Sequence, residues 1–248
     1  MRRLLISGLI PAVALFAVGC SDASVPVQPD PSTLGGPSFA RPPADPVIDG
    51  VITTGEYAAG ATISFPAMLP GGGTTPVTVS IARDRTYLYL AMTFDRGSPF
   101  HANDIVAFEF DNDNDGVRED GDDGILSGPG PILNVAQDGG DVYRTYDGTT
   151  GFAQGDELGG GTNEVIQAYG VSGTTGTFEM RKELNSGDSA HDFTIDPMRA
   201  AQTVGFLVQV SLENEPVGVN TYVHTFKPSF ATYCQLTFTR KTMAASCP

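Results

Sequence analysis

The chain has no tryptophan, and only three cysteines and three histidines among its 248 residues. None of the histidines stands in a G-x-S-x-G nucleophile elbow, an H-E-x-x-H helix or a lone Cys–His pairing. Acidic residues are plentiful, but a glycosidase needs two carboxylates that face each other across a cleft, which a sequence does not show. We therefore predict a protein that is not an enzyme. The three histidines are His101, His191 and His224.

Positive charge is also scarce. The chain has 14 Lys and Arg residues against 29 Asp and Glu residues, which gives a formal net charge of −15. So acidic a surface repels phosphate groups, which argues against nucleic acid and anionic membrane lipids as direct partners. It suits a domain that binds cations.

Long apolar runs are absent except at the amino end. Residues 4–18 carry no charge and follow Arg2 and Arg3. This run is short for a transmembrane helix and has the flanks of a signal peptide. It ends in Phe-Ala-Val-Gly-Cys, which resembles the bacterial lipobox, although leucine is usual at the place of Ala17. We predict a signal peptide over residues 1–19 and lipidation of Cys20; the alternative is an ordinary signal peptide with an incidental cysteine.

Lipidation of Cys20 would place the protein outside the cytoplasm, anchored to the cell envelope, because several acyl chains hold stably where one does not. Ser21 after the cysteine favours the outer membrane, if the host has one. The signal takes two basic residues and no acidic ones, so the mature chain has a formal charge of −17. Residues 20–46 contain seven prolines. We predict a disordered tether over residues 20–44 and a single folded domain over residues 45–248.

Cys234 and Cys247 remain once Cys20 is set aside. Outside the cytoplasm a spare pair of cysteines usually forms a disulfide, so we predict a Cys234–Cys247 bond. The alternatives are two free thiols or a metal site. Two cysteines without a nearby histidine make a poor zinc site.

The folded region alternates apolar and polar residues with a period of two. The longest such stripe is Val204, Phe206, Val208, Val210 and Leu212. Glycine-rich turns separate the stripes, and no helical period persists beyond about two turns. The pattern predicts an all-β domain, a two-sheet antiparallel β-sandwich of jelly-roll type. We expect a mobile loop over residues 148–161 and a short helix over residues 198–202. The other predicted strands lie within residues 77–81, 87–94, 106–110, 142–146, 165–171, 177–180, 222–226 and 236–238.

The order of short segments resembles the family-9-like carbohydrate-binding modules and their DOMON-like relatives. Ile48-Asp49-Gly50 and Gly55-Glu56-Tyr57 resemble the opening motif of these modules. Later segments that resemble the family are 79–84, 87–90, 104–111, 178–184, 187–193 and 204–206. The resemblance covers most of residues 46–240 and implies a β-sandwich fold, with glycans or a cell-surface partner as the ligand.

Two properties of these relatives bear on function. Sugar-binding members clamp saccharides with tryptophan, and this chain has Tyr57 where the opening motif usually has one. Other tyrosines could offer stacking faces: Tyr87, Tyr143, Tyr146, Tyr169 and Tyr222. Some DOMON-like relatives bind haem through an axial methionine with histidine or lysine, and the candidates here are Met92, Met180 and His101. We do not expect haem, because no attachment motif is present and both methionines fall on core-facing positions.

Residues 111–123 are the sharpest local signal. They fit the D-x-D-x-D-G pattern of calcium loops, in which alternate oxygens converge as the chain curls around the ion. Hard oxygen ligands without histidine or thiol select calcium. A strand rather than a helix precedes the loop, so we predict a structural calcium site between strands; the alternative is a solvated acidic turn. The predicted ligands are Asp111, Asp113, Asp115, the Val117 carbonyl, Glu119 and Asp122.

The sequence as a whole predicts a non-catalytic, calcium-stabilised surface binding module that is anchored by a lipidated cysteine. Glycans are the ligand class that the family resemblance implies. The alternatives are a haem-binding DOMON-like redox domain and an accessory cell-surface protein without a small-molecule ligand.

Overall fold

The computed structural model describes residues 45–130, 139–146, 151–196, 198–199, 201–214, 221–230 and 232–248. The predicted signal peptide, Cys20 and the tether lie outside these residues. Every described element belongs to one compact unit, Pro42–Pro248. Within the described residues, no helix is long and apolar enough to cross a membrane.

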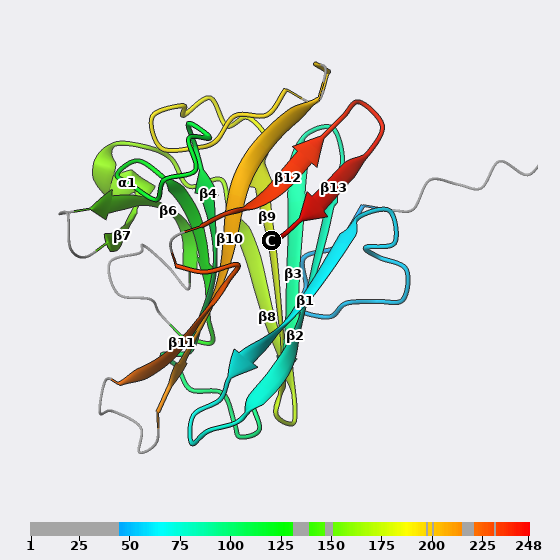
Figure 1. The fold of residues 1–248 in the computed structure, drawn as a ribbon. Helices are drawn as coiled ribbons and strands as arrows, with labels where there is room; N and C mark the ends of the chain where they lie inside the picture. The colour runs from blue at the N-terminus through cyan, green and yellow to red at the C-terminus, as the bar shows by residue number, and fades with distance from the viewer. Residues whose placement is uncertain are drawn as a thin grey trace, which may run out of the picture. The chain divides into compact units, whose positions relative to one another are not determined.

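Two antiparallel sheets face each other in a sandwich (Figure 1). The first sheet has the strand order β1-β2-β3-β9-β8, and the second has the order β13-β12-β10-β4-β5-β6-β7, with β11 also paired to β10. The first sheet consists of β1 (Ala61–Met68), β2 (Thr74–Arg83), β3 (Tyr87–Asp95), β9 (Thr175–Glu183) and β8 (Ile166–Ser172). The second consists of β13 (Met243–Ser246), β12 (Cys234–Phe238), β10 (Gln202–Glu213), β4 (Ile105–Asp111), β5 (Asp123–Ser127), β6 (Gly139–Tyr146), β7 (Gly151–Gly155) and β11 (Tyr222–Lys227).

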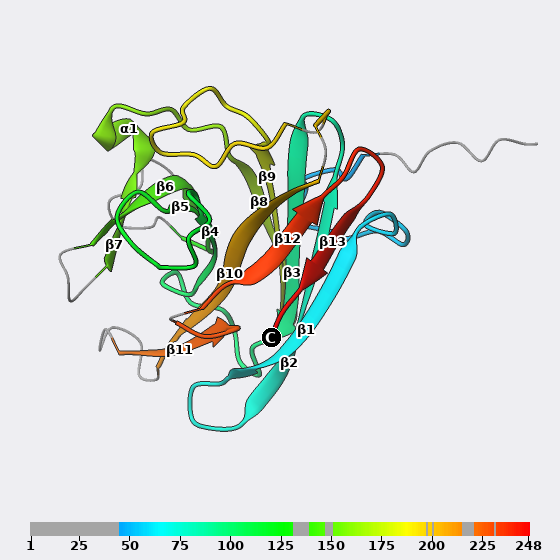
Figure 2. The same cartoon turned by 45° about the horizontal axis from the view of Figure 1, so that its top comes forward.

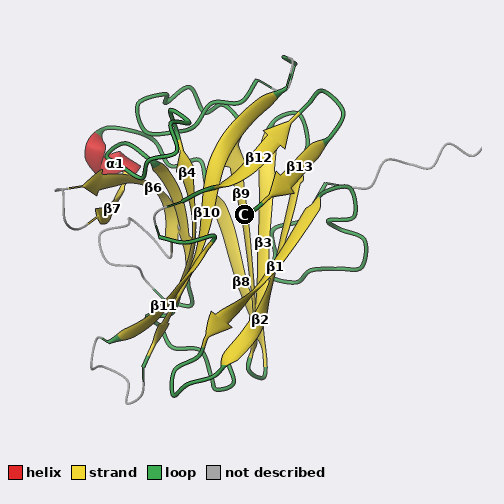
Figure 3. Cartoon of the chain, in the orientation of Figure 1, coloured by secondary structure: helices red, strands yellow, loops and turns green. Residues whose placement is uncertain are grey.

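The core lies between the sheets and is built from the alternating stripes. In β10, Val204, Phe206, Val208 and Val210 are buried in the same cluster as Leu88 and Leu90 of β3, among other residues. Side chains alternate across a strand, so these residues face inward and their neighbours face outward. The predicted all-β, two-sheet sandwich is confirmed, and strands dominate the cartoon (Figure 3).

Two local predictions were wrong in part. Residues 151–159, expected within a mobile loop, form β7 and the short helix α1 (Asp156–Gly159). The many glycines suggested a loop. Pairing with β6 at the edge of the sheet orders this segment although it has no apolar stripe. Gln202, expected in a short helix, begins β10, and Met198 lies in a turn. The sequence patterns did not predict β1, β5, β7 and β13, although β1 carries the alternating stripe Ala61, Ile63, Phe65 and Ala67.

The opening motif packs on the outer face of the first sheet. Glu179 of β9 accepts hydrogen bonds from the backbone N–H of Gly50 (2.8 Å) and Val51 (3.1 Å) and from the hydroxyl of Tyr57 (3.0 Å). Gly50 has φ +83°, and a Cβ there would lie 2.7 Å from the backbone nitrogen of Gly170 and from the backbone carbonyl carbon of Tyr169. Only glycine tolerates both the conformation and the close approach.

The structure contains the predicted Cys234–Cys247 disulfide. It joins the start of β12 to the segment after β13, with a Cα–Cα distance of 4.3 Å. The carboxyl end of the chain is thereby fixed to the second sheet.

Candidate functional site

The acidic loop starts at Asp111, the last residue of β4. Asp111 is fully buried, and its carboxylate accepts the backbone N–H groups of Asp115 (3.2 Å) and Gly116 (2.9 Å). Asn114 adopts φ +59°, and its side-chain oxygen accepts the N–H of Gly205 in β10. These bonds curl the chain into a tight loop and fix it to the neighbouring strand.

The curled loop brings three of the predicted ligands together. Carboxylate oxygens of Asp111, Asp113 and Asp115 lie within 4.8 Å of one another. Calcium–oxygen distances of about 2.4 Å place opposed ligands about 4.8 Å apart, so the spacing fits one shared ion. Repulsion from Asp115 is the largest cause of a raised pKa at Glu119, with Asp113 and Asp111 contributing. Glu119 therefore feels the same cluster of negative charge.

Two of the other predicted ligands have different surroundings. Asp122 is buried, and it accepts the hydroxyl of Tyr233 at 2.7 Å and the N–H of Glu119 at 2.9 Å. Burial raises the pKa of Asp122 to about 6. Val117 donates its N–H to Asp115 at 2.6 Å. The structure thus unites Asp111, Asp113 and Asp115 and places Asp122 beside Tyr233; calcium itself stays a prediction.

Arg118 reaches out of the loop to the outer face of the second sheet. Its guanidinium makes two hydrogen bonds to the carboxylate of Glu109 in β4, at 2.6 and 2.5 Å. The same guanidinium lies over the ring of Phe230, 4.0 Å from its centroid, and 5.7 Å from that of Phe226. The acidic loop is therefore connected directly to aromatic side chains of β11 and of the turn after it. No pattern in the sequence predicted this contact between Arg118 and the rings.

A row of rings follows β11 on this outer face. Ring centroids are separated by 5.9 Å from Tyr222 to His224, 6.3 Å from His224 to Phe226, and 5.1 Å from Phe226 to Phe230. His224 is exposed, and Phe230 is 48% exposed. We call these four residues the aromatic row. Register places Phe226 beside Gln209 and His224 beside Ser211, which line polar positions of β10.

The surroundings of His224 favour its neutral form. Its Nδ1 lies 2.7 Å from the hydroxyl oxygen of Ser211, and burial lowers its pKa from the ordinary value. A neutral imidazole presents an aromatic face and one further hydrogen-bonding nitrogen. The row can therefore make both apolar and polar contacts.

A buried ionic cluster lies at the end of the sandwich near α1. Lys182 of β9 is fully buried in the otherwise apolar inward row of Phe178, Met180 and Leu184. Its ammonium contacts Asp141, Asp192 at 2.5 Å and Asp123 at 3.3 Å. The charged residue in an apolar stripe was the available sequence signal, and we missed it. Figures 1 and 2 show α1 beside β6 and β7 at this end.

The charges of this cluster do not balance. Burial raises the pKa of Asp141 to about 8 and that of Asp156, the first residue of α1, also to about 8. Burial alone would lower the pKa of Lys182, but attraction from Asp123, Asp141 and Asp192 outweighs it and raises that pKa. Lys182 is thus held as a cation among an excess of carboxylates.

Most of the tyrosines that could stack on a sugar instead make contacts within the fold. Tyr57 is 7% exposed and bound to Glu179, and Tyr169 packs on Phe100 and Phe178. Tyr87 lies under the guanidinium of Arg181, and Tyr143 packs against the ring of His191. The side chain of Tyr146 lies outside the described residues. Of the five tyrosines proposed as stacking faces, Tyr222 belongs to the aromatic row.

The candidate haem ligands are separated by their environments. Met92 and Met180 are fully buried within the apolar core. The Nδ1 of His101 lies 3.0 Å from a guanidinium nitrogen of Arg96, whose Nε donates to Asp104 at 2.7 Å. This arrangement places His101 in a buried polar network with Arg96 rather than beside either methionine.

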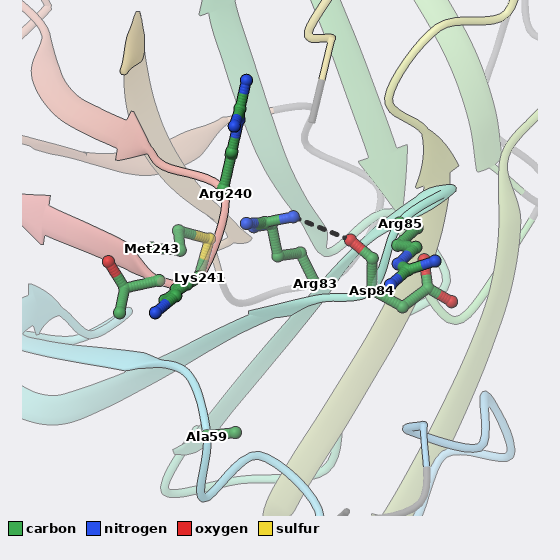
Figure 4. A pocket seen from close by; sticks show the side chains of 8 residues that line it. Ala59, Arg83, Asp84, Arg85, Arg240, Lys241 and Met243 are labelled. Carbon is green, nitrogen blue, oxygen red and sulfur yellow. Dashed lines mark hydrogen bonds between the residues drawn. The ribbon is translucent and has the colours of Figure 1, made fainter. Parts of the chain in front are cut away.

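A pocket of about 250 Å³ lies between two turns (Figure 4). Its basic side chains are partly engaged: Arg83 donates to the carbonyls of Asp84 and Thr239, and Arg240 donates to that of Met198. Arg83 thus joins the turn after β2 to the turn after β12. The pocket is the space between these two turns. The residues that line it are Ala59, Arg83, Asp84, Arg85, Arg240, Lys241, Thr242 and Met243.

The fold and the acidic loop define a two-sheet β-sandwich with a cluster of converging carboxylates between two strands. No protein-family model and no curated protein matches this chain. The solved structures that are similar to it include two of a carbohydrate-binding module of family 9 from Caldicellulosiruptor kristjanssonii. The structure with glucose shares 15% identity over 69% of this chain and 76% of that chain, with a TM-score of 0.43. The structure with cellotriose shares 14% identity over 74% and 78%, with a TM-score of 0.44.

Both are structures of the family that the sequence segments resemble.

Proposed function

We propose that this chain is a non-catalytic binding module whose acidic loop holds calcium and whose aromatic row contacts a glycan. The observation that carries the proposal is the position of Arg118. This side chain leaves the acidic loop, is fixed by Glu109 and covers Phe230. A change in the conformation of the acidic loop would therefore also change the surface of the aromatic row.

Calcium fits the loop because the oxygens of Asp111, Asp113 and Asp115 converge, and no ion pair among the described residues joins them to a lysine or arginine. Mutual repulsion in the ion-free loop would oppose its curled form. A bound calcium ion would remove that repulsion and hold Arg118 in place over the rings.

A glycan fits the aromatic row because sugar rings have apolar faces and hydroxyl edges. Rings with exposed surface supply large apolar contact area at small cost in side-chain entropy. His224, Ser211 and Gln209 place polar groups beside those rings. Few polar groups on an apolar surface are typical of ligand sites.

The test is a glycan array probed with the purified protein, with calcium and with EDTA. We expect binding that falls in EDTA and is lost in a Tyr222→Ala, Phe230→Ala double variant. Tyr87→Ala on the first sheet is the matched control and should bind as wild type. Unchanged binding in the double variant would show that the aromatic row is not the site.

We further propose that lipidated Cys20 anchors the module outside the cytoplasm, in the outer membrane if the host has one. The Cys234–Cys247 disulfide supports an oxidising compartment, since such bonds are rare in the cytosol. Palmitate labelling should be present in the wild type and absent from Cys20→Ser. Labelling that persists in the variant would contradict the anchor.

A further inference from the structure

Asp156 is buried without a hydrogen-bond partner for either carboxylate oxygen. The residue is 0% exposed, and both Oδ1 and Oδ2 lack a donor. Leaving a buried carboxylate unpaired costs more free energy than leaving a neutral polar group unpaired. No donor among the described protein groups satisfies these oxygens.

The oxygens of Asp156 point toward two further carboxylates. One oxygen each of Asp156, Asp188 and Asp192 lies within 4.8 Å of the others. The three come from separate places: Asp156 begins α1, while Asp188 and Asp192 lie in the turn region after β9. No residue of the acidic loop belongs to this group. We propose that Asp156, Asp188 and Asp192 form a second divalent-cation site that holds calcium.

Lys182 does not already fill this role. Its ammonium contacts Asp123, Asp141 and Asp192, and makes no hydrogen bond to Asp156 among the described residues. Each carboxylate oxygen has two lone pairs, so Asp192 can bind Lys182 through one and a cation through another. One lysine faces three carboxyl groups, and a divalent ion at Asp156, Asp188 and Asp192 would favour their ionised forms.

The surrounding groups orient Asp188 for such a site. His191 Nδ1 lies 2.9 Å from both oxygens of Asp188, and the N–H of Thr162 donates to Oδ2 at 3.2 Å. Gly161 closes the site: a Cβ there would lie 2.3 Å from Oδ2 of Asp188 and 3.2 Å from the Cβ of Asp156. The chain at Gly161 therefore passes close to both Asp156 and Asp188.

Calcium suits this group better than magnesium. The ligands are carboxylate oxygens on a turn and a helix start, with spacing that matches calcium–oxygen distances of about 2.4 Å. Magnesium demands near-ideal octahedral geometry and keeps several waters, which a fully buried Asp156 does not favour. The site would fasten α1 to the turn after β9 and so brace the second sheet at β7.

The test counts calcium ions bound to the purified protein by native mass spectrometry and equilibrium dialysis. We expect two ions in the wild type and one in Asp156→Asn, a variant of equal size that removes only charge. Asp188→Asn, nearer the surface, should also bind one. Glu157→Gln, the exposed neighbour of Asp156 in α1, is the matched control and should bind two.

A second variant distinguishes calcium bound at the acidic loop from calcium bound at Asp156, Asp188 and Asp192. Asp113→Ala with Asp115→Ala should bind one ion, and its combination with Asp156→Asn should bind none. If Asp156→Asn and Asp188→Asn both bind as many calcium ions as the wild type, the second site does not exist. A single wild-type ion that Asp156→Asn removes, and that the loop variant keeps, contradicts the proposed function instead.

Discussion

The hydroxyl of Tyr57 donates a hydrogen bond of 3.0 Å to Oε1 of Glu179, and so joins two residues 122 positions apart in the chain. The other oxygen of Glu179 accepts backbone N–H groups of the opening motif. Tyr57 occupies the place where sugar-binding relatives usually have tryptophan, yet here it is buried. The opening motif therefore fastens the amino end of the domain to the first sheet.

Tyr57→Phe should lower the free energy of unfolding by about 1–3 kcal/mol, because the buried Glu179 carboxylate loses a donor. Urea unfolding measures the change. Tyr87→Phe keeps its ring beneath Arg181 and should change the value by less than about 0.5 kcal/mol. Equal effects of the two variants would remove the special role of Tyr57.

Calcium should raise the melting temperature by binding the folded acidic loop and not the unfolded chain. At a hundredfold excess over the dissociation constant the gain is about 2.7 kcal/mol, or several degrees. Asp156→Asn is used as the background, so that the loop is measured alone. Adding Asp113→Ala and Asp115→Ala should abolish the shift, and magnesium should produce a smaller one. A calcium shift of equal size in both chains would reduce residues 111–123 to a solvated turn.

Lys182→Met should destabilise the fold by about 3–5 kcal/mol, because it leaves several buried carboxylates without their cation. The methionine fits the apolar row of β9, so lost volume contributes little. Arg181→Met, one position earlier on the opposite face, is the control and should cost about 1 kcal/mol or less. Chemical denaturation in EDTA measures the free energy of unfolding of both variants. An equal loss in the two variants would contradict the role given to Lys182.

Stability in EDTA should fall as the pH rises from about 5 to 8. Burial raises the pKa of Asp141 from 3.8 to about 8, so the folded chain holds a proton that the unfolded chain has released. The folded state then binds more protons, and its free energy of unfolding declines with pH across this window. Asp141→Asn should flatten the slope of melting temperature against pH. A slope that survives in the variant must have another source.

The Cys234–Cys247 bond closes a short loop, with a sequence separation of 13. On the loop-closure model it stabilises the fold by about 3 kcal/mol. A Cys234→Ser, Cys247→Ser chain should melt lower by a corresponding amount, and reduction of the wild type should reproduce the loss. Alkylation of both thiols in the native, unreduced protein would contradict the bond.

Much of the fold followed from local sequence. Alternation marked β3, β4 and β10, since inward and outward positions recur every second residue whatever the partner strand. It missed β7 and β13, whose pairing partners supply the order that their own side chains do not. The D-x-D-x-D-G spacing likewise predicted the convergence of Asp111, Asp113 and Asp115, because neighbours in a tight loop approach through backbone geometry alone.

Tertiary structure decided what local spacing does not encode. Lys182 meets Asp123 and Asp141 only because β9 of one sheet faces β5 and β6 of the other. Arg118 reaches Phe230 across 112 positions because β4 and β11 both flank β10. The sequence by itself determined which residues alternate and which oxygens cluster within one loop. The order of strands in the two sheets determined which distant charges and rings meet, because sheet pairing joins segments without regard to their separation along the chain.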